Sequence, residues 1–78
     1  MAKNVTIYST PECPYCLRAK EFLKENNIDF SDVDVSDNQI ARQEMTRKSE
    51  QMGVPVFDID GQIIVGFDKD AISKALDL

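Results

Sequence analysis

Two cysteines, Cys13 and Cys16, are the only thiols of this 78-residue chain, and they lie within the stretch Cys13-Pro14-Tyr15-Cys16. Pro14 suits the first position of a helix, where a missing backbone N–H costs nothing. Cys13 should therefore sit at a helix N-terminus, where free N–H groups favour the thiolate, which is the nucleophilic form. Cys16 should follow one turn later on the same face, within reach of a disulfide.

Three kinds of chemistry could use this pair of thiols. A structural disulfide over two intervening residues closes a very small loop and would restrain the unfolded chain little. A zinc site needs about four ligands. The chain has no histidine and no further cysteine, so zinc would have to be shared between chains. A redox dithiol needs only these two residues, and it is the interpretation that we favour.

Length and composition indicate a single small domain over residues 1–78, with a thin core. The net charge of -5 argues against a nucleic-acid surface and against binding to an anionic membrane. No apolar run approaches transmembrane length, and a strand pattern begins at once, so we expect no signal peptide. A redox motif without a targeting segment favours a protein of the reducing cytoplasm.

Hydrophobic periodicity and turn residues predict an alternating order of strands and helices. We expect a strand over 4–8, a helix over 14–26, a strand over 28–35, a helix over about 38–48, hairpin strands over 56–59 and 62–65, and a final helix. Asp60-Gly61 supplies a strong two-residue hairpin turn, and Asp68 can cap the final helix. The apolar stripe of that helix is most simply core: Ala71, Ile72, Ala75 and Leu76.

The second strand and the second helix carry further signals. The acidic residues of the strand suit a sheet edge: Asp29, Asp32 and Asp34. Ser36 with Gln39 three residues later resembles a capping box at the start of the helix. The apolar side of this helix would carry Ile40, Ala41 and Met45. Its cationic residues would form a solvated face: Arg42, Arg47 and Lys48.

This order of elements predicts where distant segments meet. The first two strands should be parallel and joined by a right-handed crossover through the first helix. If the third strand lies antiparallel beside the first, its start falls next to the end of the first strand. Residues 10–16, 53–55 and 66–68 then converge at one rim of the sheet, and a site follows from the topology.

With these motifs in this order, the chain resembles a glutaredoxin. Cys13-Pro14-Tyr15-Cys16 matches the dithiol motif of that family, and Gly53-Val54-Pro55 resembles its Thr-Val-Pro, whose proline is cis. Gly66-Phe67-Asp68 resembles the Gly-Gly-x-Asp turn before the last helix. The likeness covers almost the whole chain. It implies an α/β thioredoxin fold, in which a four-stranded mixed sheet is flanked by three helices in the order β-α-β-α-β-β-α.

The resemblance also implies a glutathione-dependent thiol–disulfide oxidoreductase that reduces protein disulfides and glutathione mixed disulfides. Cys13 would attack the substrate disulfide and Cys16 would resolve the mixed disulfide. We expect a monomer without a tightly bound cofactor or metal, whose partners are glutathione and oxidised or glutathionylated proteins. The resemblance implies these glutathione-binding residues: Tyr15, Gly53, Val54, Pro55, Gly66, Phe67 and Asp68.

Several positions depart from the family pattern. Thr10 stands where glutaredoxins often carry Lys or Arg, and Glu12 puts a negative charge beside Cys13. Gly53, Val65 and Lys69 are also unusual at their positions. Two alternatives therefore stay open. One is a redoxin that thioredoxin reductase reduces and that serves a partner such as ribonucleotide reductase, although the Trp-containing stretch of such proteins is missing. The other is an iron–sulfur cluster shared by two chains and two glutathiones.

Overall fold

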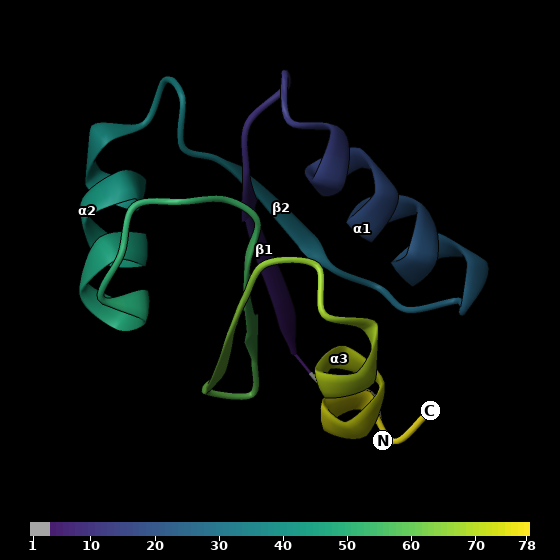
Figure 1. Cartoon of the computed structure of the whole chain (residues 1–78). Coiled ribbons are helices and arrows are strands. Elements are labelled where there is room, and N and C mark those ends of the chain that lie inside the picture. The colour runs from purple at the N-terminus through teal and green to yellow at the C-terminus, as the bar shows by residue number, and fades with distance from the viewer. Residues whose placement is uncertain (1–3) are drawn as a thin grey trace.

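A computed structural model describes residues 4–78 of the chain (Figure 1). Its elements are β1 (Val5–Ser9), α1 (Pro14–Glu25), β2 (Ser31–Asp34), α2 (Gln39–Ser49), β3 (Val56–Ile59), β4 (Gln62–Val65) and α3 (Lys69–Leu76). The predicted order is confirmed, and most predicted ends agree to within one residue.

The start of β2 is the exception, since the strand begins at Ser31 and not at Ile28. Asn27 adopts a positive φ of 56°, a left-handed conformation that asparagine tolerates at the end of a helix. The N–H of Ile28 then donates to the carbonyl of Leu23 at 2.9 Å, which closes the end of α1. Residues 28–30 therefore finish the helix-to-strand connection, and pairing with β1 starts only at Ser31.

The four strands form one mixed sheet in the order β2-β1-β3-β4. β1 runs parallel to β2 and antiparallel to β3, and β3 and β4 form the predicted hairpin. β2 is thus an edge strand, and both of its acidic residues are exposed, as the charge pattern predicted. The thioredoxin-like α/β fold expected from the resemblance is confirmed.

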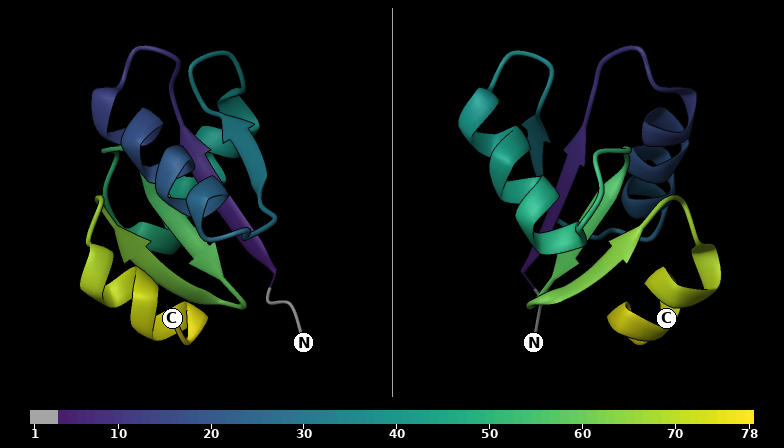
Figure 2. Two further views of the ribbon diagram at one scale, coloured as in Figure 1. Left: turned by 90° about the vertical axis from the view of Figure 1, so that its right-hand side faces the viewer. Right: turned by 60° about the vertical axis from the view of Figure 1, so that its left-hand side comes forward.

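Helices cover both faces of the sheet, and each face has its own core (Figure 2). α1 and α3 pack on one face, around the fully buried Phe57, Ile7 and Leu23. α2 packs on the other face, around Met45 and Val56. Alternation along β1 and β3 supplies both cores, because successive side chains of a strand point to opposite faces.

The predicted capping box of α2 is wrong. Asn38 caps the helix, and its side-chain oxygen accepts a hydrogen bond from the N–H of Ala41 at 3.0 Å. Ser36 instead donates its own N–H to the carboxylate of Asp34 at 2.8 Å, in a turn before the helix. With this start, Ala41 and Met45 face the sheet, whereas Ile40 is 78% exposed and not part of the core.

The expected solvated cationic face of α2 is also only partly right. Arg47 is exposed, but Lys48 lies 2.9 Å from a carboxylate oxygen of Asp58 and 3.1 Å from the hydroxyl of Tyr8. These hydrogen bonds raise the pKa of Lys48, and the bond from Lys48 lowers the pKa of Asp58. Arg42 donates from its guanidinium to the carbonyl of Val35 at 2.9 and 3.0 Å. Two of the three cations therefore fasten α2 to the rest of the chain.

Among residues 4–78, no helix has the length and apolar composition that crossing a membrane requires.

Candidate active site

Cys13 occupies the N-cap position of α1, with Pro14 as the first helical residue. Its sulfur accepts a hydrogen bond from the backbone N–H of Cys16 at 3.3 Å. The thiol therefore takes the place that a serine or aspartate side chain usually fills at a helix start. An N-cap sulfur faces the positive end of the helix dipole, which favours negative charge there. The predicted position of Cys13 is confirmed.

Cys16 differs from Cys13 in exposure and in protonation. Both thiols are free, but Cys16 is fully buried whereas Cys13 is half-buried. Burial raises the pKa of Cys16 to about 11, with smaller contributions from the hydrogen bond and the charge of Cys13. The backbone of Thr10 and the charge of Lys20 act in the opposite direction. Cys16 is thus a thiol at neutral pH, and Cys13 is the sulfur that solvent can reach.

The segment before β3 lies directly against Cys13. The Cys13 sulfur is 4.0 Å from the carbonyl oxygen of Val54, and the Val54–Pro55 peptide bond is cis, as predicted. Pro55 is fully buried, and its carbonyl accepts a hydrogen bond from the N–H of Gly66 at 2.8 Å. The three segments that the topology was expected to gather at one rim therefore do meet.

Gln51, which the sequence did not mark, holds Gly53 by both backbone groups. Its side-chain oxygen accepts from the N–H of Gly53 at 2.6 Å, and its side-chain nitrogen donates to the carbonyl of Gly53 at 2.9 Å. A Cβ at Gly53 would lie 2.7 Å from that side-chain oxygen, so this clamp fits glycine. Gln51 therefore fixes the backbone of Gly53 just before the cis Val54–Pro55 bond. In the sequence, the unusual Gly53 could have drawn attention to this loop. Its contact with Gln51 becomes visible only in the structure.

The turn before α3 supplies the third part of the rim. Gly66 has a positive φ of 83°, which glycine adopts without strain. Asp68 caps α3, and its carboxylate accepts from the N–H of Ala71 at 3.1 Å. The ring of Phe67 packs edge-to-face on Phe22 with centroids 5.9 Å apart. The Phe67 side chain is thus part of the packing between α1 and this turn.

Two side chains near Cys13 in the sequence are exposed to solvent. Tyr15 is 59% exposed, and the guanidinium of Arg18 lies 5.8 Å from its ring centre. Glu12 is also exposed. The rim therefore combines an accessible aromatic ring with the backbone of Val54 beside the Cys13 sulfur.

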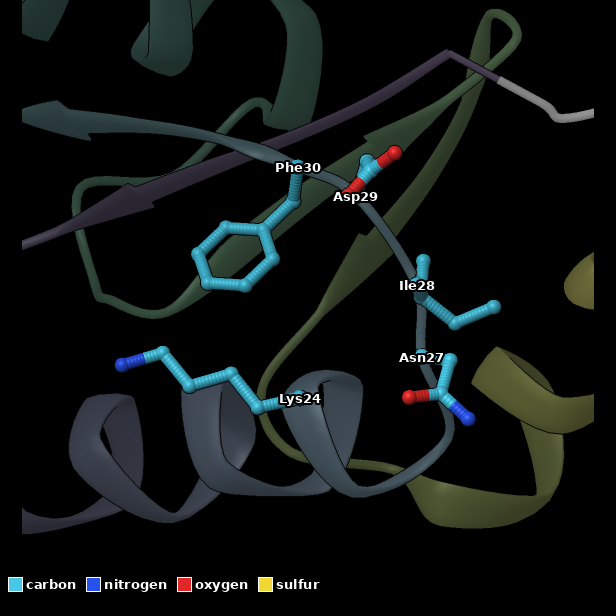
Figure 3. Close-up of a pocket in the computed structure, with 5 residues that line it drawn as sticks. All are labelled: Lys24, Asn27, Ile28, Asp29 and Phe30. Carbon is cyan, nitrogen blue, oxygen red and sulfur yellow. The ribbon is translucent and has the colours of Figure 1, made fainter.

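A pocket elsewhere on the molecule lies between the end of α1 and the connection to β2 (Figure 3). Its lining residues are Lys24, Asn27, Ile28, Asp29 and Phe30. No sulfur lines it, and the cysteines lie at the opposite end of α1. Within residues 4–78 there is also no cluster of three or more Cys, Asp or Glu residues that could hold a metal ion.

Comparison with known proteins places this site in a family. The sequence model of the family described as Glutaredoxin matches residues 5–64. The chain belongs to the glutaredoxin family. It is a glutaredoxin-like thiol–disulfide oxidoreductase with a Cys-x-x-Cys pair.

Individual relatives agree with this assignment. The chain is 55% identical, over 94% of its length and 97% of the relative's, to an "uncharacterized glutaredoxin-like 8.6 kDa protein in rubredoxin operon" of Clostridium pasteurianum. It is 40% identical to glutaredoxin 3 of Escherichia coli K12, over 83% of this glutaredoxin-family chain and 78% of the relative. Among solved structures, the thioredoxin-like protein BC3987 superimposes with a TM-score of 0.88 at 32% identity, over 94% of this chain and 100% of the other.

Proposed function

We propose that this protein is a glutathione-dependent oxidoreductase of the dithiol Cys-Pro-Tyr-Cys type, formed by one domain over residues 1–78 and acting in the cytoplasm. The observation that carries this proposal is the difference between the two thiols. Cys13 is accessible at the start of a helix, whereas Cys16 is fully buried and has a pKa of about 11. The Cys13 sulfur is placed to attack a substrate, and Cys16 stays a protonated thiol until the second step.

The reaction then has two exchange steps. The thiolate of Cys13 attacks one sulfur of a substrate disulfide, forms a mixed disulfide and releases the other sulfur as a thiolate that takes up a proton. Cys16, after losing its proton, attacks the Cys13 sulfur, which forms the Cys13–Cys16 disulfide and releases the reduced substrate. Two molecules of glutathione restore the dithiol and leave as glutathione disulfide.

The rim offers glutathione an extended backbone edge. Val54 and Pro55 lie beside the Cys13 sulfur, where a peptide could pair with their backbone. The first turn of α3, which begins after Asp68, offers the positive end of a helix dipole to a carboxylate. Tyr15 would form one wall, and Gly53, Gly66 and Phe67 would shape the floor through their backbones. These contacts need few particular side chains, so the missing cation at Thr10 should weaken binding without abolishing it.

One assay tests both the chemistry and the reductant. Reduction of a small glutathione mixed disulfide is followed with millimolar glutathione and glutathione reductase, beside a parallel reaction driven by thioredoxin reductase. We expect turnover in the first reaction. Cys13→Ser should abolish it, whereas Cys16→Ser should keep activity on glutathione mixed disulfides and lose most activity on protein disulfides. Equal losses from both variants on both substrates would contradict the proposed roles.

A redoxin reduced by a flavoprotein such as thioredoxin reductase is the second candidate. Three observations favour it. The relative from Clostridium pasteurianum is described as an uncharacterized glutaredoxin-like protein in a rubredoxin operon, and the solved structure named above is described as thioredoxin-like. Thr10 and Glu12 also leave the rim without the cation that would favour a glutathione carboxylate. If glutathione fails at millimolar levels while thioredoxin reductase drives turnover, this candidate replaces the first.

A further inference from the structure

A chain of polar contacts starts at Lys20, one helical turn after the buried thiol of Cys16, and has no part in the exchange steps above. Lys20 follows Cys16 by four residues on α1, so the two side chains share one face of the helix. The Lys20 ammonium is 2.7 Å from one carboxylate oxygen of Asp32 on β2, and the Lys20 side chain is only 18% exposed. The other oxygen of Asp32 accepts from the hydroxyl of Ser9 at 2.7 Å.

Ser9 makes this arrangement rigid. It is 1% exposed, it ends β1, and its carbonyl accepts a hydrogen bond from the N–H of Val35 at 2.9 Å. Asp32 is therefore fixed to the sheet, and it fixes Lys20 in turn. Asp32 thus sets the position of the Lys20 ammonium, while its own negative charge offsets part of the field that Lys20 exerts on neighbouring groups.

Two groups favour the thiolate of Cys16 in the folded protein: the backbone of Thr10 and the charge of Lys20. Burial opposes them most strongly, followed by the hydrogen bond and the charge of Cys13. In the mixed disulfide, however, the Cys13 sulfur is bonded to the substrate and carries neither proton nor charge. Of these influences on Cys16, only burial then still opposes Thr10 and Lys20, so even the small effect of Lys20 has its largest share at the step in which Cys16 reacts.

We propose that Lys20, held by Asp32 and Ser9, is a positioning residue whose charge promotes deprotonation of Cys16 in the resolving step. This inference rests on the proposed exchange mechanism. In that step, Cys16 gives its proton to solvent, its thiolate forms a bond to the Cys13 sulfur, and the bond between Cys13 and the substrate sulfur breaks. The substrate leaves as a thiolate and takes a proton from solvent, so atoms, charge and electrons balance.

The direct test measures the pH at which Cys16 ionises in a Cys13→Ser background, by thiolate absorbance and by the rate of alkylation with iodoacetamide. Lys20→Met keeps the length of the side chain and removes its charge. We expect the midpoint to rise by roughly half a pH unit, in the range of a partly paired, partly exposed charge. Lys20→Arg should restore the original midpoint, and Lys20→Gln repeats the charge removal if the methionine variant folds poorly.

Lys24→Met is the matched control. It removes the same charge from an exposed position on the same helix, eight residues from Cys16 and hence about 12 Å along the axis. At that separation, screening by salt removes most of the interaction. The midpoint of Cys16 should stay unchanged in this variant. Equal midpoints in wild-type, Lys20→Met and Lys20→Gln backgrounds would overturn the inference, and so would an equal shift from Lys24→Met.

Turnover provides the second readout. A rise of half a unit lowers the thiolate fraction about threefold, but a thiolate of higher pKa is also more nucleophilic, so the net loss should be about twofold. Lys20→Met should therefore slow reduction of a protein disulfide about twofold and leave the monothiol reaction of a Cys16→Ser variant unchanged. A wild-type protein without any thiol–disulfide turnover would contradict the proposed function, whereas normal turnover with no selective loss would contradict only the role of Lys20.

Discussion

At the scale of single residues, position gives two identical side chains different properties. Cys13 caps a helix and remains accessible, whereas Cys16, one turn later, is fully buried. The sequence alone predicted the two positions, at the helix start and one turn later, because a proline between the two fixes where the helix begins. It did not predict Lys20, which we propose to promote ionisation of the buried thiol, or Gln51, which holds the loop at Gly53. Lys20 and Gln51 act through partners 12 and 2 residues away, and the first of these lies on another element.

The raised pKa of Cys16 predicts how stability depends on pH. The ordinary pKa of 9.0 applies to the unfolded chain, and the folded value is about 11. Folding therefore favours the protonated thiol. The stabilisation is fully present below pH 9 and is lost as the pH rises through 11. We expect the free energy of unfolding of the reduced protein to fall by about 1–3 kcal/mol across this window.

Chemical denaturation at several pH values checks this expectation. A Cys16→Ala variant is the control, because Lys48 also titrates at high pH and its contribution is present in both proteins. The difference in stability between the two proteins should shrink between pH 9 and 11. Parallel curves would show that burial does not disfavour the thiolate of Cys16.

At the scale of elements, the starts of α1 and α3 serve both folding and the site. Asp68 caps α3 by accepting from Ala71, and the same helix end faces the rim. Replacing Asp68 with alanine removes the cap and should lower the free energy of unfolding by about 0.5–2 kcal/mol. Asp68→Asn should keep the stability, because asparagine caps as well as aspartate. Urea denaturation of the three proteins gives the comparison, and equal destabilisation by both changes would contradict a capping role.

Most elements could be predicted because their signals are local. The alternation of Val5 and Ile7, the Asp60-Gly61 turn and the stripe of α3 each lie within a few residues. The start of α2 could not be fixed in this way, because Ser36 and Asn38 are both good caps. The competing bond from Ser36 to Asp34 decides between them. The contacts of Lys48 depend on the register that brings Tyr8 and Asp58 under α2, so no local sequence pattern could predict them.

At the scale of the whole molecule, the negative net charge of the protein disfavours binding of glutathione, the ligand that we propose for the rim. The chain carries a net charge of -5, and glutathione is also an anion at neutral pH. A Thr10→Lys variant should therefore lower the half-saturating glutathione concentration several-fold, since an exposed ion pair contributes about 0–1 kcal/mol. The gain should shrink as salt is added, because exposed charges are screened. Steady-state kinetics at low and high salt tests this, and a gain independent of salt would exclude a charge effect.

The central claim is that Cys13 forms a mixed disulfide with the substrate and that Cys16 resolves it. Mass spectrometry of the single-cysteine variants after exposure to glutathione disulfide at neutral pH tests this claim most directly. The Cys16→Ser variant should accumulate one glutathione per chain, bound to Cys13. The Cys13→Ser variant should remain unmodified, because its single thiol is buried and protonated. Rapid glutathionylation of Cys16 in the second variant, or none of Cys13 in the first, would contradict the account.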